Sequence, residues 1–126
     1  MENSGDFNFN NHFSARTKKF ALSICKIVDK CSSRESTRTI TKQLVRSGTS
    51  VAANFRAASR ARSHAEYYSK ICIVVEECDE SLFWFELLED LLPDKNQDIC
   101  KIKAEALELL KVFSVTKKKL KNNNTK

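Results

Sequence analysis

The stretch SRESTRTITKQLVRSGTSVAANFRAASRA, residues 33–61, decides the fold. At about 100° per residue, its apolar positions fall within an arc of about 60° of a helix; they are Ile40, Leu44, Val51, Phe55 and Ala58. The basic positions fall in an arc of about 120° on the opposite side; they are Arg34, Arg38, Lys42, Arg46, Arg56 and Arg60. The stretch therefore predicts one amphipathic helix with an apolar inner face and a basic outer face.

Gly48 lies in the middle of this predicted helix, where a glycine costs about 1 kcal/mol relative to alanine. Its neighbours in the sequence, residues 47–53, are small except for Val51. A run of small side chains at this place predicts that another backbone approaches the helix closely.

Three further segments show helical periodicity. The apolar positions of the first are Phe13, Phe20, Ile24, Ile27, Val28 and Cys31; those of the last are Ile99, Ile102, Ala106, Leu109, Leu110 and Phe113. The third segment in the chain begins with Ser63 and Glu66, which match a capping box, and it ends before Pro93.

These four segments predict an all-α fold, with residues 12–115 forming an antiparallel up-down-up-down four-helix bundle because short connections favour antiparallel neighbours. The chain has only two glycines and one proline, too few for a strand-rich fold. Residues 1–11 are rich in asparagine, and residues 116–126 consist mainly of lysine and asparagine. We therefore predict a disordered N-terminal segment over 1–11 and a disordered basic tail over 116–126.

A tight turn near Ser63 would pair positions of the second and third helices whose numbers add to roughly 126. This pairing places Arg46 near Glu80, Arg60 near Glu66, and Ser47 and Ser50 near residues 76–80. Ion pairs and hydrogen bonds that fix the register are the favoured interpretation. A functional polar site at the small residues is the alternative.

The residues give little support for catalysis or for a cofactor. The five cysteines form no C-x-x-C pair, and neither histidine has a glutamate at the spacing of di-metal bundles. We predict no catalytic residue, no metal and no cofactor. With no apolar leader and no long uncharged apolar stretch, the sequence indicates a cytoplasmic protein without a membrane segment.

The charge is distributed unevenly along the chain. Residues 12–62 hold twelve Lys or Arg and two acids, whereas residues 63–115 hold five basic residues and twelve acids. Clustered Lys and Arg bind phosphate backbones, so the basic helix face and the tail residues Lys117, Lys118 and Lys119 are candidate contacts for RNA or DNA. Alternatively, the basic half docks on an acidic protein or on the acidic half of a neighbouring subunit.

The third helix carries apolar residues on more than one side, because Val74, Phe83, Trp84, Leu87 and Leu91 lie outside its main stripe. A helix with such a wide apolar surface needs more than its own bundle to cover it. This surface predicts self-association.

Two blocks of the sequence resemble a known family: residues 43–63, with the core QLVRSGTSVAANFRAA, and residues 76–84, EECDESLFW. They are similar to the proteins encoded in intervening sequences of bacterial 23S ribosomal RNA genes, and to the accessory variability proteins of diversity-generating retroelements. The resemblance covers about residues 13–115, although the arginine-rich stretch 55–62 departs from many members.

The resemblance implies a four-helix bundle that assembles into a homopentameric ring and engages nucleic acid or a reverse-transcriptase-like partner. The family's recurrent positions correspond to Ser47, Ser50, Asn54, Glu77, Glu80 and Trp84. None has a catalytic role in the family, so we interpret them as structural.

Overall fold

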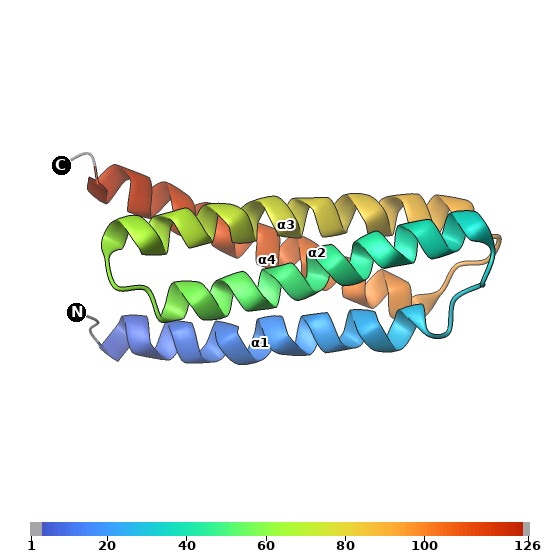
Figure 1. Cartoon of the computed structure of the whole chain (residues 1–126), viewed down its shortest axis with the longest axis horizontal. Coiled ribbons are helices and arrows are strands. Elements are labelled where there is room, and N and C mark those ends of the chain that lie inside the picture. The colour runs from blue at the N-terminus through green and yellow to red at the C-terminus, as the bar shows by residue number, and fades with distance from the viewer. Residues whose placement is uncertain (1–3, 125–126) are drawn as a thin grey trace.

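The computed structural model describes the backbone of residues 4–124 as four helices: α1 (Ser4–Val28), α2 (Glu35–Ser59), α3 (His64–Leu91) and α4 (Gln97–Asn124) (Figure 1). No strand occurs among these described residues. The prediction of an all-α fold with four helices is confirmed.

The helices lie side by side along the long axis, and Figure 1 shows both ends of the chain at one end of the molecule. Each helix packs against two others, in the cyclic order α1, α2, α3, α4. The contact between α2 and α3 is the most extensive, and that between α1 and α4 is much the smallest. α1 and α3 therefore occupy diagonal corners of the bundle.

The core consists largely of the apolar stripes expected from the sequence. All five inner-face positions of α2 are buried. Each helix also contributes one large aromatic ring that is at most 2% exposed: Phe20, Phe55, Phe85 and Phe113. Burying such a side chain stabilises the fold by about 1.5–3 kcal/mol, so these four rings are a main source of stability.

Side chains at the turns set where the helices begin. The hydroxyl of Ser63 accepts a hydrogen bond from the amide of Glu66 at 3.1 Å, which confirms the predicted cap of α3. Asn96 caps α4 in the same way, because its Oδ1 accepts from the amides of Asp98 and Ile99. α3 ends at Leu91, two residues before Pro93, which cannot continue a helix.

Gly48 lies where α2 meets α1. A Cβ atom built on this glycine would overlap with Cδ1 of Ile24, a side chain that is fully buried. The group that approaches Gly48 most closely is therefore a side chain of α1, not another backbone.

The helices extend beyond the predicted bundle at both ends. The sequence predicted disorder over 1–11 and 116–126, but residues 4–11 belong to α1 and residues 116–124 to α4. At the N-terminal end the ring of Phe9 packs 4.7 Å from that of Phe13, and Asn10 is buried. At the C-terminal end Leu120 packs against the core. Residues 1–3 and 125–126 lie outside the described residues.

Candidate nucleic-acid interface

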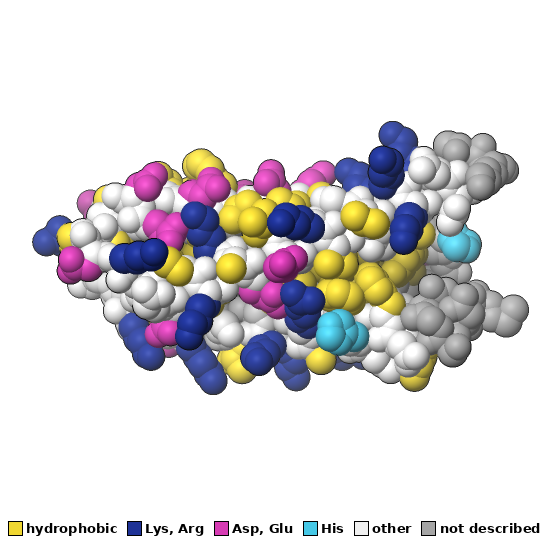
Figure 2. Space-filling model, turned by 180° about the vertical axis from the view of Figure 1, so that it is seen from behind, with side chains coloured by type: hydrophobic (Ala, Val, Ile, Leu, Met, Phe, Trp, Pro, Cys, Tyr) yellow, Lys and Arg dark blue, Asp and Glu magenta, His cyan; other side chains and the backbone are white. Residues whose placement is uncertain are grey.

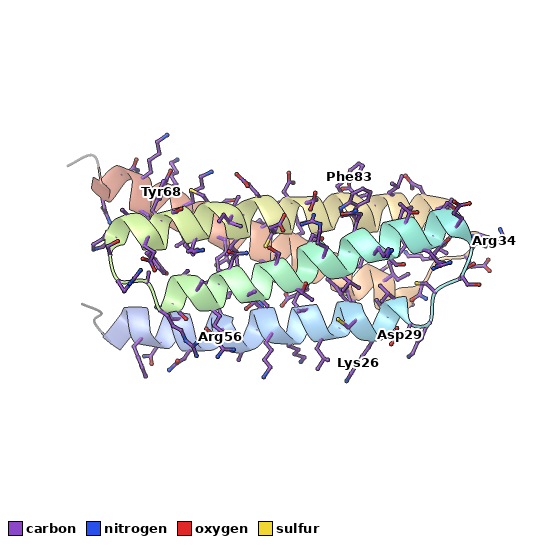
Figure 3. The ribbon with its side chains drawn as sticks, in the orientation of Figure 1. Lys26, Asp29, Arg34, Arg56, Tyr68 and Phe83 are labelled. Carbon is purple, nitrogen blue, oxygen red and sulfur yellow. The ribbon has the colours of Figure 1, made fainter. Side chains whose placement is uncertain are left out.

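The predicted basic positions of α2 are all exposed. Arg34 immediately precedes the helix and Arg60 immediately follows it, and Figure 3 shows Arg34 and Arg56 near its opposite ends. Five of the six side chains form no ion pair within the described chain. We call these five the α2 basic face: Arg34, Arg38, Lys42, Arg56 and Arg60.

Arg46, the sixth position, is bound to α3. Its guanidinium donates to Glu77 Oε2 at 3.0 Å and forms an ion pair with Glu80, and its Nε donates to Oε1 of Gln43 at 3.0 Å. The predicted pairing of Arg46 with Glu80 is confirmed. Because two carboxylates neutralise this guanidinium, Arg46 is the least available of the six for a phosphate.

The predicted pairing of Arg60 with Glu66 is wrong. Glu66 instead lies 3.6 Å from the Nε of Arg62, which precedes it by four residues. Ser63 begins α3 between these two residues, so Glu66 faces back toward the turn rather than toward α2. Arg60 is therefore left without an acidic partner.

The α2 basic face is divided into two clusters. Arg34, Arg38 and Lys42 follow one another at four-residue intervals, about 6 Å apart along the helix axis. Between Lys42 and Arg56 the axis extends about 20 Å, and the only basic residue in that interval is Arg46. Each cluster can contact phosphates independently.

The lysines predicted to lie in a disordered tail are part of α4. Lys118 and Lys119 are exposed and Lys117 is half-buried. Because successive helical residues are about 100° apart, the three ammonium groups face different directions. Figure 1 places this end of α4 at the same end of the bundle as the C-terminal end of α2, with Arg56 and Arg60.

The recurrent positions of the motif lie along the contact between α2 and α3. The hydroxyl of Ser81 donates to Oγ of Ser47 at 2.8 Å, and both side chains are fully buried. Together with the ion pairs of Arg46, these residues form what we call the α2–α3 polar seam: Arg46, Ser47, Glu77, Glu80 and Ser81. The seam fixes how the two helices slide along each other, which is a structural role.

Two further motif residues make local contacts. Nδ2 of Asn54 donates to the hydroxyl and the carbonyl of Ser50, both at 2.9 Å. The ring of Trp84 packs edge-on against Phe83, with 5.0 Å between centroids. The indole Nε1 of Trp84 is buried without a hydrogen-bond partner in the described chain.

Ser81 was missed by the sequence reasoning, because it lies one residue beyond the acidic run expected to face Ser47.

A shallow groove of about 520 Å³ follows the sparse contact between α1 and α4. Arg16 crosses it and donates two hydrogen bonds of 2.7 Å to Glu105, and these bonds raise the pKa of Arg16 above its ordinary value. Lys19 and Lys101 stand on either side. The pair of Arg16 and Glu105 was not foreseen, because 89 residues separate the two in sequence and the pairing of α1 with α4 has no short connecting turn to fix it.

Two of the described thiols, Cys78 and Cys100, are poorly suited to nucleophilic chemistry, which requires the thiolate. Burial raises the pKa of Cys78 to about 12, and the carboxylate of Glu89 raises the pKa of Cys100. Within residues 4–124 no three His, Cys, Asp or Glu side chains gather closely enough to hold a metal. No helix in that range is both long enough and apolar enough to cross a bilayer.

The geometry defines the molecule as an α-helical bundle with a polar inner seam and an exposed basic face. One solved structure has the same architecture: a crystal structure of a protein of unknown function from the S23 ribosomal protein family of Bacteroides thetaiotaomicron. The two share 28% sequence identity with a TM-score of 0.77, over 86% of this chain and 97% of the other. No curated protein sequence matches the chain.

The family model for the 23S rRNA-intervening sequence protein matches residues 10–114. The chain therefore belongs to this family, and the matched region coincides with the predicted bundle domain at both ends to within two residues.

Proposed function

We propose that this protein is a non-enzymatic nucleic-acid-binding protein of the cytoplasm, in which an antiparallel up-down-up-down bundle presents the α2 basic face to phosphates. The bundle works as an oligomer, so that several basic faces act together. No cofactor takes part in this function.

The observation that carries the proposal is the set of five exposed basic side chains on α2 that have no acidic partner in the described chain. Arg46, the sixth basic position, is instead paired with Glu77 and Glu80 of α3. Each phosphate neutralised on B-form DNA contributes about −0.9 to the slope of log K against log salt. Five contacts per subunit therefore correspond to a slope of about −4.5.

Structured RNA is the first ligand to test. The family takes its name from intervening sequences of 23S ribosomal RNA, and the solved relative belongs to a family named after a ribosomal protein. The α2 basic face carries no exposed aromatic side chain for stacking on bases. This composition favours binding to the backbone of a folded RNA or a duplex, with little discrimination by sequence.

The assembly we propose is the homopentameric ring implied by the family resemblance. It is supported by the exposed apolar side chains of α3, Phe83, Leu87 and Leu91. Light scattering on the eluting protein should give a mass several times the 14.4 kDa of one chain. A single-chain mass at micromolar concentration would remove this part of the proposal.

The binding experiment is a fluorescence-anisotropy titration of a structured RNA and a matched DNA duplex at several salt concentrations. The test variant carries Arg38→Glu, Lys42→Glu and Arg56→Glu. The control carries Lys70→Glu, Lys95→Glu and Lys111→Glu, which change the net charge equally on α3, α4 and the turn between them. We expect the test variant to lose at least tenfold more affinity than the control and to show a shallower salt slope.

Equal losses in the two variants would show that binding depends on net charge and not on the α2 basic face. If neither RNA nor DNA binds at low salt, the alternative function gains support: a scaffold ring whose basic face docks an acidic or reverse-transcriptase-like protein partner. The separation of charge between the two halves of the chain favours that alternative over any enzymatic one.

A further inference from the structure

The outer side of α3 carries a continuous apolar stripe. Phe83, Leu87 and Leu91 follow at four-residue intervals and are 52%, 38% and 44% exposed. Residues at this spacing lie above one another on one helix face. Figure 3 shows Phe83 projecting away from the bundle. A monomer gains nothing from leaving three large apolar side chains together in water.

The stripe is bordered by acids. Asp79, Glu86 and Asp90 each lie within one helical turn of Phe83 or Leu87 and are exposed. None of the three forms an ion pair within the described chain. We call these six residues the α3 acidic stripe.

A complementary surface lies on α1. Leu22 is 52% exposed, and Lys18, Lys19 and Lys26 lie within one turn of it on the same outer side. All three lysines are exposed and form no ion pair in the described chain. Asp29, just after the end of α1, is the nearest acid in the sequence. We call Leu22 and the three lysines the α1 basic patch.

The two surfaces lie on opposite edges of the molecule. α1 and α3 occupy diagonal corners of the bundle, and Figure 3 shows Lys26 and Phe83 on opposite edges. Figure 2, seen from the other side, shows acidic side chains along the α3 edge and basic side chains along the α1 edge. The two surfaces of one copy therefore cannot meet each other, but those of two copies can.

We propose that the α3 acidic stripe of one copy docks on the α1 basic patch of a second copy. This inference rests on the self-association in the proposed function and specifies its surfaces. Contact of α3 with α3 is disfavoured, because it would place unpaired acids against acids. Contact of α3 with α1 places the acids that border the apolar stripe next to the lysines of the α1 basic patch. It also covers Leu22 with the apolar stripe.

A contact between two different surfaces is heterologous, so it continues from copy to copy and forms a ring when the rotation between copies closes. It also leaves α2 uncovered, because α2 lies at a third corner of the bundle. The α2 basic faces of all copies would then remain available for nucleic acid.

The first test is the mass in solution of Leu22→Asp and Phe83→Asp, measured by light scattering. The control is Leu107→Asp on α4, which replaces a side chain that is 40% exposed and lies outside both surfaces. We expect both test variants to elute at the 14.4 kDa of one chain with unchanged helical circular dichroism. The control should keep the wild-type mass.

The second test exchanges the charges. Lys18→Glu with Lys26→Glu should give single chains, and so should Asp79→Lys with Asp90→Lys. All four substitutions together in one chain restore opposite charges across the contact, so the multimer should return. A structural defect from the substitutions would not be rescued in this way.

A multimeric Leu22→Asp variant, or a fourfold variant that stays a single chain, would overturn this docking mode while leaving self-association intact. A wild-type protein that is itself a single chain would overturn the docking and the proposed assembly together. Neither result touches nucleic-acid binding by α2, which the anisotropy titration tests separately.

Discussion

The contact between α2 and α3 and the contact between α1 and α4 hold the bundle together in different ways. Between α2 and α3, a buried hydroxyl pair and a guanidinium shared by two carboxylates accompany extensive packing. Between α1 and α4, packing is sparse, and the ion pair of Arg16 with Glu105 crosses a groove. The buried hydroxyl pair lies where the helices pack most closely, and each hydroxyl has a partner there, as most buried polar groups do.

The largest difference between the two contacts should appear when one core phenylalanine is removed from each. Phe85 on α3 is fully buried, whereas Phe20 lines the groove between α1 and α4. Phe→Ala in a core costs about 3–5 kcal/mol, and less where the surroundings can collapse into the cavity. We expect Phe85→Ala to lie at the upper end of that range and Phe20→Ala at the lower end, measured by urea unfolding.

Equal losses for the two variants would show that the groove closes in solution and that the two contacts are equally tight. Phe113→Ala serves as a reference, because that ring is fully buried among Phe13 and Phe55 from α1 and α2.

The pairing of Arg46 in the middle of the α2–α3 hairpin was predictable from the sequence, whereas the pair predicted beside the turn, Arg60 with Glu66, was wrong, and the contacts between α1 and α4 were not predicted. A tight turn at Ser63 fixes which residues face each other, so the pairing of Arg46 with Glu80 followed from residue numbers alone. No such turn joins α1 to α4, so nothing in the sequence indicated that Arg16 would meet Glu105. The apolar stripes of all four helices were visible because burial repeats with the helical period.

The ends of the bundle were misjudged for a related reason. Residues 4–11 contain three asparagines, and their composition resembles a disordered segment. Tertiary contacts outweigh that composition, because Phe9 packs on Phe13 and the hydroxyl of Tyr67 donates to Asn10 at 3.2 Å. The basic face of α2 was predicted well from periodicity. The periodicity of α2 alone does not show that Arg46 is neutralised, because its acidic partners lie on α3.

A smaller effect should come from the buried hydroxyl pair of the α2–α3 polar seam. Ser47→Ala removes the acceptor of Ser81 and leaves a buried hydroxyl without its partner, which costs about 1–3 kcal/mol. The double variant Ser47→Ala with Ser81→Ala removes both groups and should recover most of that loss. Thermal or urea unfolding of the two single variants and the double variant gives the coupling directly. Additive losses would mean that the two hydroxyls are satisfied independently and do not fix the register.

The smallest effect should come from the contact between α3 and α4. This contact is less extensive than the one between α2 and α3 and more extensive than the one between α1 and α4. There Glu89 accepts from Lys103 Nζ at 2.7 Å and from the thiol of Cys100 at 3.2 Å. The hydrogen bond from Lys103 is the main cause that lowers the pKa of Glu89 below its ordinary value of 4.5. A carboxylate with a lowered folded pKa stabilises the fold above its unfolded pKa, and this contribution is lost as the pH falls through the folded pKa.

Both side chains of this pair keep about a quarter to a third of their surface exposed, so solvent screens the pair and its contribution should be below about 1 kcal/mol. We expect Lys103→Met to lower the urea midpoint slightly at pH 7 and by less at pH 3, because the contribution of Glu89 is lost as the pH falls through its lowered folded pKa. Lys101→Met is the matched control, because Lys101 lies two residues earlier, on roughly the opposite side of α4, and forms no ion pair in the described chain. An equal loss at both pH values would assign the effect of Lys103 to packing of its aliphatic stem and not to its charge.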